Sequence, residues 1–285
     1  MKRWRWLLVL SIIVAAGGGV WAYLKATRED CNKPYSALTR DGVLFITVAF
    51  GYKDSRPLRF VGDRYERAAF TDLLLRPCAG SEVVCGFAID PANAEFFTKK
   101  LVWYDKRERV IHIQVLTSSV GPDDQWNRTS RIQKWNSDRT LRLFRRALVK
   151  SDIVFYSGHS RTGGGPDFSP PLIHSSGLIR YQHYQEQQPG FKFLIEDLER
   201  AKGARQPRLL GLFSCSSTNH FMDKILKTKP KLGLIASEAL LHQSDAMENM
   251  MAALTAVLKG ECQTRFNERL RSSDPLVGSK IVGFF

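Results

Sequence analysis

Two short apolar runs, each leading to a residue with reactive chemistry, constrain the fold of this 285-residue chain most strongly. The run at 153–157 leads to His159, and the run at 209–213 leads to Cys215. Four or five consecutive apolar residues bounded by glycine or small polar residues are typical of a buried parallel strand. Because open α/β folds bind ligands beyond the carboxyl ends of such strands, we predict that both residues lie at that edge.

The rest of the chain alternates between strand and helix patterns, which indicates an α/β protein. Further strands are predicted at 43–50, 109–117 and 232–236. Helical spacing of apolar residues, with capping residues and glycine or proline stops, predicts helices at 63–75, 93–101, 139–150, 191–202, 218–227 and 245–259. Such alternation predicts βαβ units, and therefore a mainly parallel sheet with helices on both faces.

The N-terminus predicts export from the cytoplasm. Residues 7–24 carry no charge and follow a short basic start, so they can just span a bilayer with the basic end inside. They are either a signal anchor in the inner membrane or a cleaved signal peptide. In both cases the remainder lies in the periplasm or outside the cell. We therefore divide the chain into this segment (1–24), a polar linker (25–40) and one α/β domain (41–285).

Composition restricts the partners of the protein. The net charge of +14 favours anionic surfaces and polymers, but the basic residues are spread along the chain without a nucleic-acid-binding motif. We therefore predict no specific nucleic acid. The sequence contains no phosphate loop or dinucleotide motif, and its histidines lack the spacing of a zinc site, so no cofactor and no metal are predicted. The oligomeric state is left open.

The five cysteines fit an oxidising compartment and single out one thiol. Cys78 and Cys85 flank a short segment and are predicted to close a small loop, while Cys31 and Cys262 are candidates to tie together the two ends of the soluble part. Sequence alone leaves other pairings open. This arrangement leaves Cys215 as the odd cysteine, and an unpaired cysteine in an exported protein is a candidate reactive thiol.

A cysteine and a histidine at neighbouring strand ends suit nucleophilic catalysis. A thiolate is the attacking species, and a nearby imidazole accepts its proton and returns it to the leaving group. We predict Cys215 as nucleophile and His159 as base. The backbone N–H groups of Gly158, Ser160 and Cys215 are candidate donors to an oxyanion.

In the strands that lead to His159 and Cys215, the chain resembles the caspase, legumain and gingipain clan of cysteine peptidases. The resemblance consists of an apolar strand that leads to His159 and a later one that ends in a small residue and Cys215. Their separation is close to the spacing of about 50 residues given for caspases. The resemblance implies a caspase-like three-layer sandwich and cleavage of a peptide or protein substrate. Two departures are Ser160, where the clan usually has glycine, and the absence of a Gln-Ala-Cys motif.

Three acids are candidates for a pocket that would accept a basic side chain of the substrate. Asp167, Glu238 and Asp245 lie in or near loops that follow predicted strands. Acidic residues at such positions also serve as helix caps or as ordinary surface charges, and the pattern does not separate these roles.

Two other functions compete with the peptidase. Residues 158–162 nearly match the Gly-x-Ser-x-Gly turn of α/β-hydrolases, which would make Ser160 the nucleophile of an esterase, although Thr162 replaces the second glycine. The acid and base of that enzyme would come from Asp245, His220 and His242. Alternatively, the chain is an inactive, membrane-tethered binding module of the same fold. The spare cysteine and the mismatch at Thr162 favour the peptidase.

Overall fold

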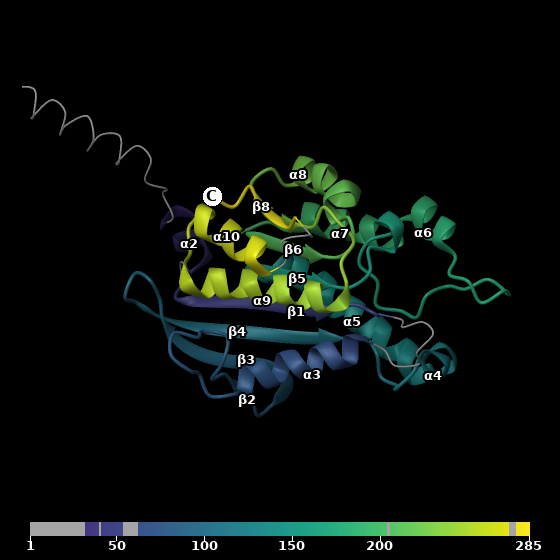
Figure 1. Ribbon diagram of the computed structural model, residues 1–285, viewed down its shortest axis with the longest axis horizontal. Coiled ribbons are helices and arrows are strands. Elements are labelled where there is room, and N and C mark those ends of the chain that lie inside the picture. Colours follow the sequence, from purple (N-terminus) through teal and green to yellow (C-terminus); the bar gives the residue numbers. More distant parts are fainter. Residues whose placement is uncertain (1–31, 40, 54–61, 204–205, 274–277) are drawn as a thin grey trace, which may run out of the picture.

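A single eight-stranded sheet forms the centre of the molecule (Figure 1). The computed structural model describes residues 32–285 except 40, 54–61, 204–205 and 274–277. The strands follow the order β2-β3-β4-β1-β5-β6-β7-β8 across the sheet. Their bounds are β1 Val43–Phe50, β2 Ala88–Asp90, β3 Asn93–Val102, β4 Glu108–Thr117, β5 Ile153–Ser157, β6 Leu209–Phe213, β7 Gly233–Ala236 and β8 Lys280–Val282.

The sheet is mostly parallel, which confirms the fold class predicted from the alternating pattern. β1 pairs in parallel with both β4 and β5, and β5–β6 and β6–β7 are parallel as well. Antiparallel pairs occur towards the two edges, where β2, β3 and β8 lie. The central strands are buried along almost their whole length, as parallel strands covered on both faces should be.

Helices cover the two faces of the sheet, each with its own hydrophobic core (Figure 1). Alternate residues of β5 divide between the cores: Ile153 and Phe155 belong to one, Val154 and Tyr156 to the other. The first core packs against α3 Gly62–Leu75, α9 Gln243–Lys259 and α10 Gln263–Ser273; the second packs against α5 Arg131–Lys150, α7 Pro189–Arg200 and α8 Asp223–Thr228. Shorter elements are α2 Asn32–Leu38, α4 Asp124–Thr129, α6 Tyr181–Gln187 and the single turns η1 Arg161–Gly163 and η2 Thr218–Met222.

Two local predictions were wrong. Residues 93–101, predicted as a helix, form strand β3, because Phe97 is buried in the first core and the segment pairs with β4 from Phe96 onwards. Residues 32–38, predicted as part of a linker, form helix α2. Its Tyr35 is fully buried and donates a hydrogen bond of 2.6 Å to the Glu261 carbonyl, so the domain begins earlier than residue 41.

The predicted N-terminal membrane segment, residues 1–24, lies outside the described residues. Within the part of the chain that the structure describes, no helix is both long and apolar enough to cross a bilayer.

The predicted Cys78–Cys85 disulfide is present, with a sequence separation of 7. Cys262 is also disulfide-bonded, whereas Cys31, the partner predicted for it, lies outside the described residues. Cys215 is free, as predicted. The loop between Cys78 and Cys85 is further held by Lys99, whose ammonium donates to the Cys85 carbonyl at 2.7 Å.

Replacing Cys78 and Cys85 together by serine is expected to lower the free energy of unfolding by about 2 kcal/mol, because the closed loop is short and its cross-link removes little chain entropy. Urea denaturation of the variant and of wild type measures the difference. Using a variant rather than a reductant leaves the disulfide of Cys262 intact. An unchanged midpoint would show that hydrogen bonds alone, such as those of Lys99, hold the loop.

Candidate active site

His159 and Cys215 lie in one cavity at the carboxyl edge of the sheet. Ser157 of β5 and Phe213 of β6 are paired in register, and each is followed two residues later by one member of the predicted dyad. The cavity has a volume of about 320 Å³. It is lined by His159, Ser160, Arg161, Thr162, Tyr181, Cys215, Ser216, His220 and Leu240.

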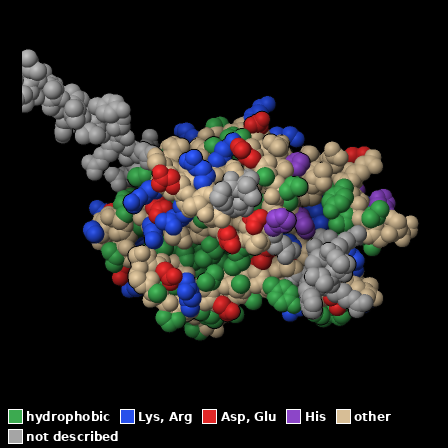
Figure 2. Space-filling model, in the orientation of Figure 1, with side chains coloured by type: hydrophobic (Ala, Val, Ile, Leu, Met, Phe, Trp, Pro, Cys, Tyr) green, Lys and Arg blue, Asp and Glu red, His purple; other side chains and the backbone are tan. Residues whose placement is uncertain are grey.

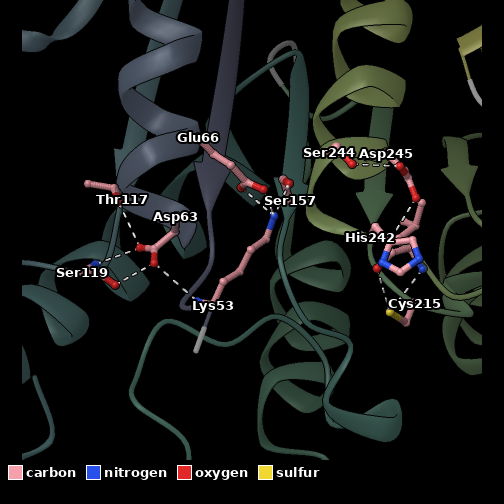
Figure 3. A network of polar contacts seen from close by, with 11 residues as sticks. Lys53, Asp63, Glu66, Thr117, Ser119, Ser157, Cys215, His242, Ser244 and Asp245 are labelled. Atoms are coloured by element: carbon pink, nitrogen blue, oxygen red, sulfur yellow. Dashed lines mark hydrogen bonds and ion pairs between the residues drawn. The ribbon is translucent and has the colours of Figure 1, made fainter. Parts of the chain in front are cut away.

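The loop that follows β7 fixes Cys215 from the other side. The Leu241 N–H donates to the Cys215 sulfur at 3.4 Å, and the thiol in turn faces the Leu241 carbonyl at 3.6 Å. The next residue along, Ser216, donates its N–H to the Ala239 carbonyl at 2.9 Å. Figure 3 shows Cys215 beside the start of α9, next to His242. Cys215 is half-buried. The loop after β7 thus contacts both its sulfur, through Leu241, and the backbone of the following residue, Ser216, through Ala239.

His159 is held through its backbone, and its side chain is half-buried. The buried Tyr156 hydroxyl donates to the His159 carbonyl at 3.1 Å, and it also accepts from the Asp167 N–H at 3.0 Å. Tyr156 therefore ties together the start and the end of the loop that carries the histidine. Burial raises the pKa of Tyr156, which keeps its hydroxyl protonated and able to donate.

Backbone strain is concentrated around this cavity. Among the described residues, only five that are not glycine have positive φ, and three of them line the cavity: Arg161, Thr162 and Ser216, with φ of 46°, 52° and 49°. Each such residue costs on the order of 1 kcal/mol, and this kind of strain persists mainly at functional sites. Residues 214–217, which include Cys215, form the cysteine loop. The π-helical turn η2, which carries His220, directly follows this loop, and such turns are often found at functional sites.

Two of the three backbone N–H groups predicted to bind an oxyanion make no hydrogen bond within the described residues. Among the described residues, the N–H groups of Ser160 and Cys215 donate to no acceptor. Gly158, the third predicted donor, is engaged, because its N–H donates to the Phe213 carbonyl at 3.3 Å. Of the three predicted donors, the two that remain flank the cavity from the histidine loop and the cysteine loop.

The glycine-rich stretch after the histidine packs tightly against α7. Gly165 has φ of +95°, and a Cβ there would lie 2.2 Å from the Phe191 nitrogen. The Phe191 N–H donates to the Gly164 carbonyl at 2.8 Å. The glycines thus let the histidine loop lie directly on the start of a helix, which fixes its position relative to the sheet.

Gly165→Ala is expected to lower the free energy of unfolding by about 2 kcal/mol, since both the positive φ and the contact with Phe191 oppose a side chain. Gly177→Ala is the matched control, because Gly177 also has positive φ (+79°) but a Cβ there meets nothing within 4 Å. Urea denaturation compares the two. Equal losses would show that the contact with α7 carries no energy.

None of the three acids predicted for a substrate pocket lines the cavity. Asp167 pairs with Arg161 at 3.1 Å, and Glu238 pairs with Lys280 at 2.5 Å. Asp245 accepts from the His242 N–H at 3.0 Å and so caps helix α9. Each acid therefore has a partner within the fold. These contacts correspond to the roles of helix cap and surface charge that the sequence had left open.

Two residues of the alternative hydrolase also line the cavity, Ser160 and His220. Ser160 is 5% exposed and has relaxed helical backbone angles, φ −78° and ψ −12°. A hydrolase nucleophile sits instead on a strained turn that exposes its hydroxyl. Asp245 and His242, the other two candidates for that enzyme, do not line the cavity. Burial lowers the pKa of His220 below its ordinary value.

A buried polar network, which sequence patterns did not reveal, lies beside the site at the same edge of the sheet (Figure 3). The Lys53 ammonium contacts both carboxylate oxygens of Glu66 at 2.5 Å and donates to the Ser157 hydroxyl at 3.0 Å. Next to this pair, Asp63 is fully buried and accepts from the Ser119 hydroxyl at 2.7 Å. Burial raises the pKa of both Asp63 and Glu66.

Comparisons with protein-family models, with curated proteins and with solved structures find no match for this chain. Within the described residues, no three His, Cys, Asp or Glu side chains are grouped so that they could hold a metal ion. The fold and the site define an α/β protein with one mostly parallel sheet. At the carboxyl edge of that sheet, a free cysteine and a histidine share a cavity.

Proposed function

We propose that this chain is a cysteine endopeptidase with a caspase-like α/β sandwich, in which Cys215 is the nucleophile and His159 the base. The supporting observation is that a free thiol and an imidazole follow two adjacent, in-register parallel strands and line one cavity. The unsatisfied N–H groups of Ser160 and Cys215 border the same space, where they can stabilise a developing oxyanion.

The reaction needs no group beyond these and water. The Cys215 thiol gives its proton to His159, and the thiolate attacks the carbonyl carbon of the scissile amide while negative charge moves to the oxygen. The C–N bond then breaks, and the amine leaves with the proton from the imidazolium. Water attacks the resulting thioester as His159 takes its proton. Breakage of the C–S bond releases the carboxylic product, and the imidazolium returns its proton to the sulfur, which restores the thiol.

We also propose that the domain works outside the cytoplasm, held at the inner membrane by residues 1–24 or released from it. The Cys78–Cys85 disulfide supports this, because disulfides persist mainly in oxidising compartments. The basic start followed by an uncharged run at 7–24 supports it independently. Expression of the full chain, fractionation and N-terminal sequencing test the proposal. A full-length chain found only in the soluble cytoplasmic fraction would contradict it.

The nucleophile is tested by thiol alkylation and by a serine variant, using a library of fluorogenic peptide amides and esters as substrates. Treatment of the folded protein with iodoacetamide is expected to label Cys215 and to stop turnover. Ser160→Ala is expected to retain most of its activity, because the peptidase uses the Ser160 backbone N–H and not its hydroxyl. If Ser160→Ala is inactive while the alkylated protein still turns over esters, the serine esterase is the correct function. Absence of any turnover by the folded wild type would favour the binding module.

A further inference from the structure

The cavity that holds the dyad offers a substrate side chain apolar contacts and no acidic partner. Leu240 and Tyr181 line it, and they are among the most exposed large hydrophobic residues of the described chain, at 76% and 51%. In Figure 2, hydrophobic and histidine side chains are prominent at the end of the molecule where Figure 1 places α6. Single exposed apolar residues are common on protein surfaces, but two at the mouth of a catalytic cavity are a surface for contact.

Leu240 is placed by the same loop that holds the nucleophile. The residue before it, Ala239, accepts from the Ser216 N–H, and the residue after it, Leu241, contacts the Cys215 sulfur. The backbone of Leu240 therefore lies between two residues that are hydrogen-bonded to Cys215 and Ser216, which keeps Leu240 at the cavity. An apolar residue held in this way beside a nucleophile is suited to recognise the substrate.

Arg161, the one Lys, Arg, Asp or Glu residue in the described lining of the cavity, is already paired. The Arg161 side chain is 1% exposed and bonds Asp167, and its guanidinium also lies over the Tyr184 ring at 5.7 Å. Glu238 and Asp245, the nearest acids on the loop of Leu240 and on α9, serve Lys280 and the cap of α9. A charged side chain entering the cavity would lose hydration without gaining an opposite charge from the described lining.

We propose that the site selects substrates whose residue on the carbonyl side of the scissile bond is apolar and uncharged, of the size of leucine, methionine or phenylalanine. This specificity rests on the proposed peptidase function and adds the class of substrate to it. Leu240 and Tyr181 form the apolar walls that contact this side chain. The specificity replaces the preference for a basic side chain that the three acids suggested from sequence.

The test measures kcat/KM on fluorogenic peptide amides that differ only in the residue before the scissile bond. Leucine is expected to exceed arginine and aspartate by about 10- to 200-fold, the range that apolar pockets achieve. Leu240→Ala is expected to lower kcat/KM for the leucine peptide about tenfold, mainly by raising KM. Leu240→Glu is expected to reverse the preference, so that the arginine peptide becomes the better substrate.

Val102→Glu is the matched control. Val102 is 64% exposed and lies away from the cavity, where the end of β3 pairs with the amino end of the parallel strand β4. The Val102→Glu substitution introduces the same charge in place of an exposed apolar residue and is expected to leave the ranking of substrates unchanged. The high exposure of Leu240 and Val102 means that neither substitution disturbs the core.

The outcomes separate this proposal from the function on which it rests. If wild type cleaves arginine or aspartate peptides best, and turnover still requires Cys215, the specificity is wrong while the peptidase stands. The same conclusion follows if Leu240→Glu leaves the ranking of substrates as it was. If no peptide is cleaved whichever residue precedes the bond, both proposals fail together.

Discussion

Replacing Cys215 with alanine is expected to lower kcat/KM for peptide hydrolysis by about 10⁴-fold or more, because the proposed mechanism then has no nucleophile and retains only binding and the proposed oxyanion donors. His159→Ala is expected to cause a loss of the same order, since the thiol then has no base to accept its proton. Steady-state kinetics on the best leucine peptide, with active-site titration of wild type, measures both losses.

The two losses are also expected not to add. Once one member of a catalytic pair is removed, the other has little left to do, so the double variant should be nearly as active as each single variant. His183→Ala is the matched control, because His183 is exposed on α6 and lies outside the cavity. If His159→Ala kept most of the wild-type activity while His220→Ala lost it, the base would be His220, which lines the same cavity.

The shared location of His159 and Cys215 could be predicted from sequence because its signal is local and repeated. Each reactive residue follows a short apolar run, and runs of this kind, once buried in a parallel sheet, end at the same edge. The register of β5 against β6, in which Ser157 pairs with Phe213, is the consequence. The helices on both faces followed from the same alternation. By contrast, Asn93–Val102 lacked a clear strand pattern, and its pairing with β4 decided its structure.

Contacts between residues that lie far apart along the chain could not be predicted from local sequence patterns. The acids predicted for the substrate pocket were chosen by their position after strands, but their partners decide their roles: Lys280 lies 42 residues from Glu238 along the chain. Leu240 appeared only as one apolar residue in a loop, and its exposure beside Cys215 depends on how that loop packs on the cysteine. The Lys53–Glu66 pair likewise joins a strand end to a helix, for which no spacing rule exists.

That buried pair gives the largest expected effect on stability. Lys53 and Glu66 are 3% and 8% exposed, and Lys53 also reaches Ser157, two residues before His159. Lys53→Met is expected to lower the free energy of unfolding at pH 8 by about 3–5 kcal/mol, because Glu66 is left buried without its counter-charge. The double variant Lys53→Met/Glu66→Leu is expected to lie within about 1–2 kcal/mol of wild type, because neither charge then remains in the interior.

The loss in Lys53→Met should also depend on pH in a defined direction. Burial already raises the pKa of Glu66 above that of an unfolded carboxyl, and Lys53 is the largest influence that lowers it, so the variant raises this pKa further. A carboxyl whose folded pKa is raised contributes stability that is fully present below its unfolded pKa and is lost as pH rises through the folded one. The single variant is therefore expected to regain stability relative to wild type as pH is lowered from 8, while the double variant should not. Urea denaturation across this range measures both, and a loss that stays constant with pH would show that Glu66 is already neutral in the wild-type fold.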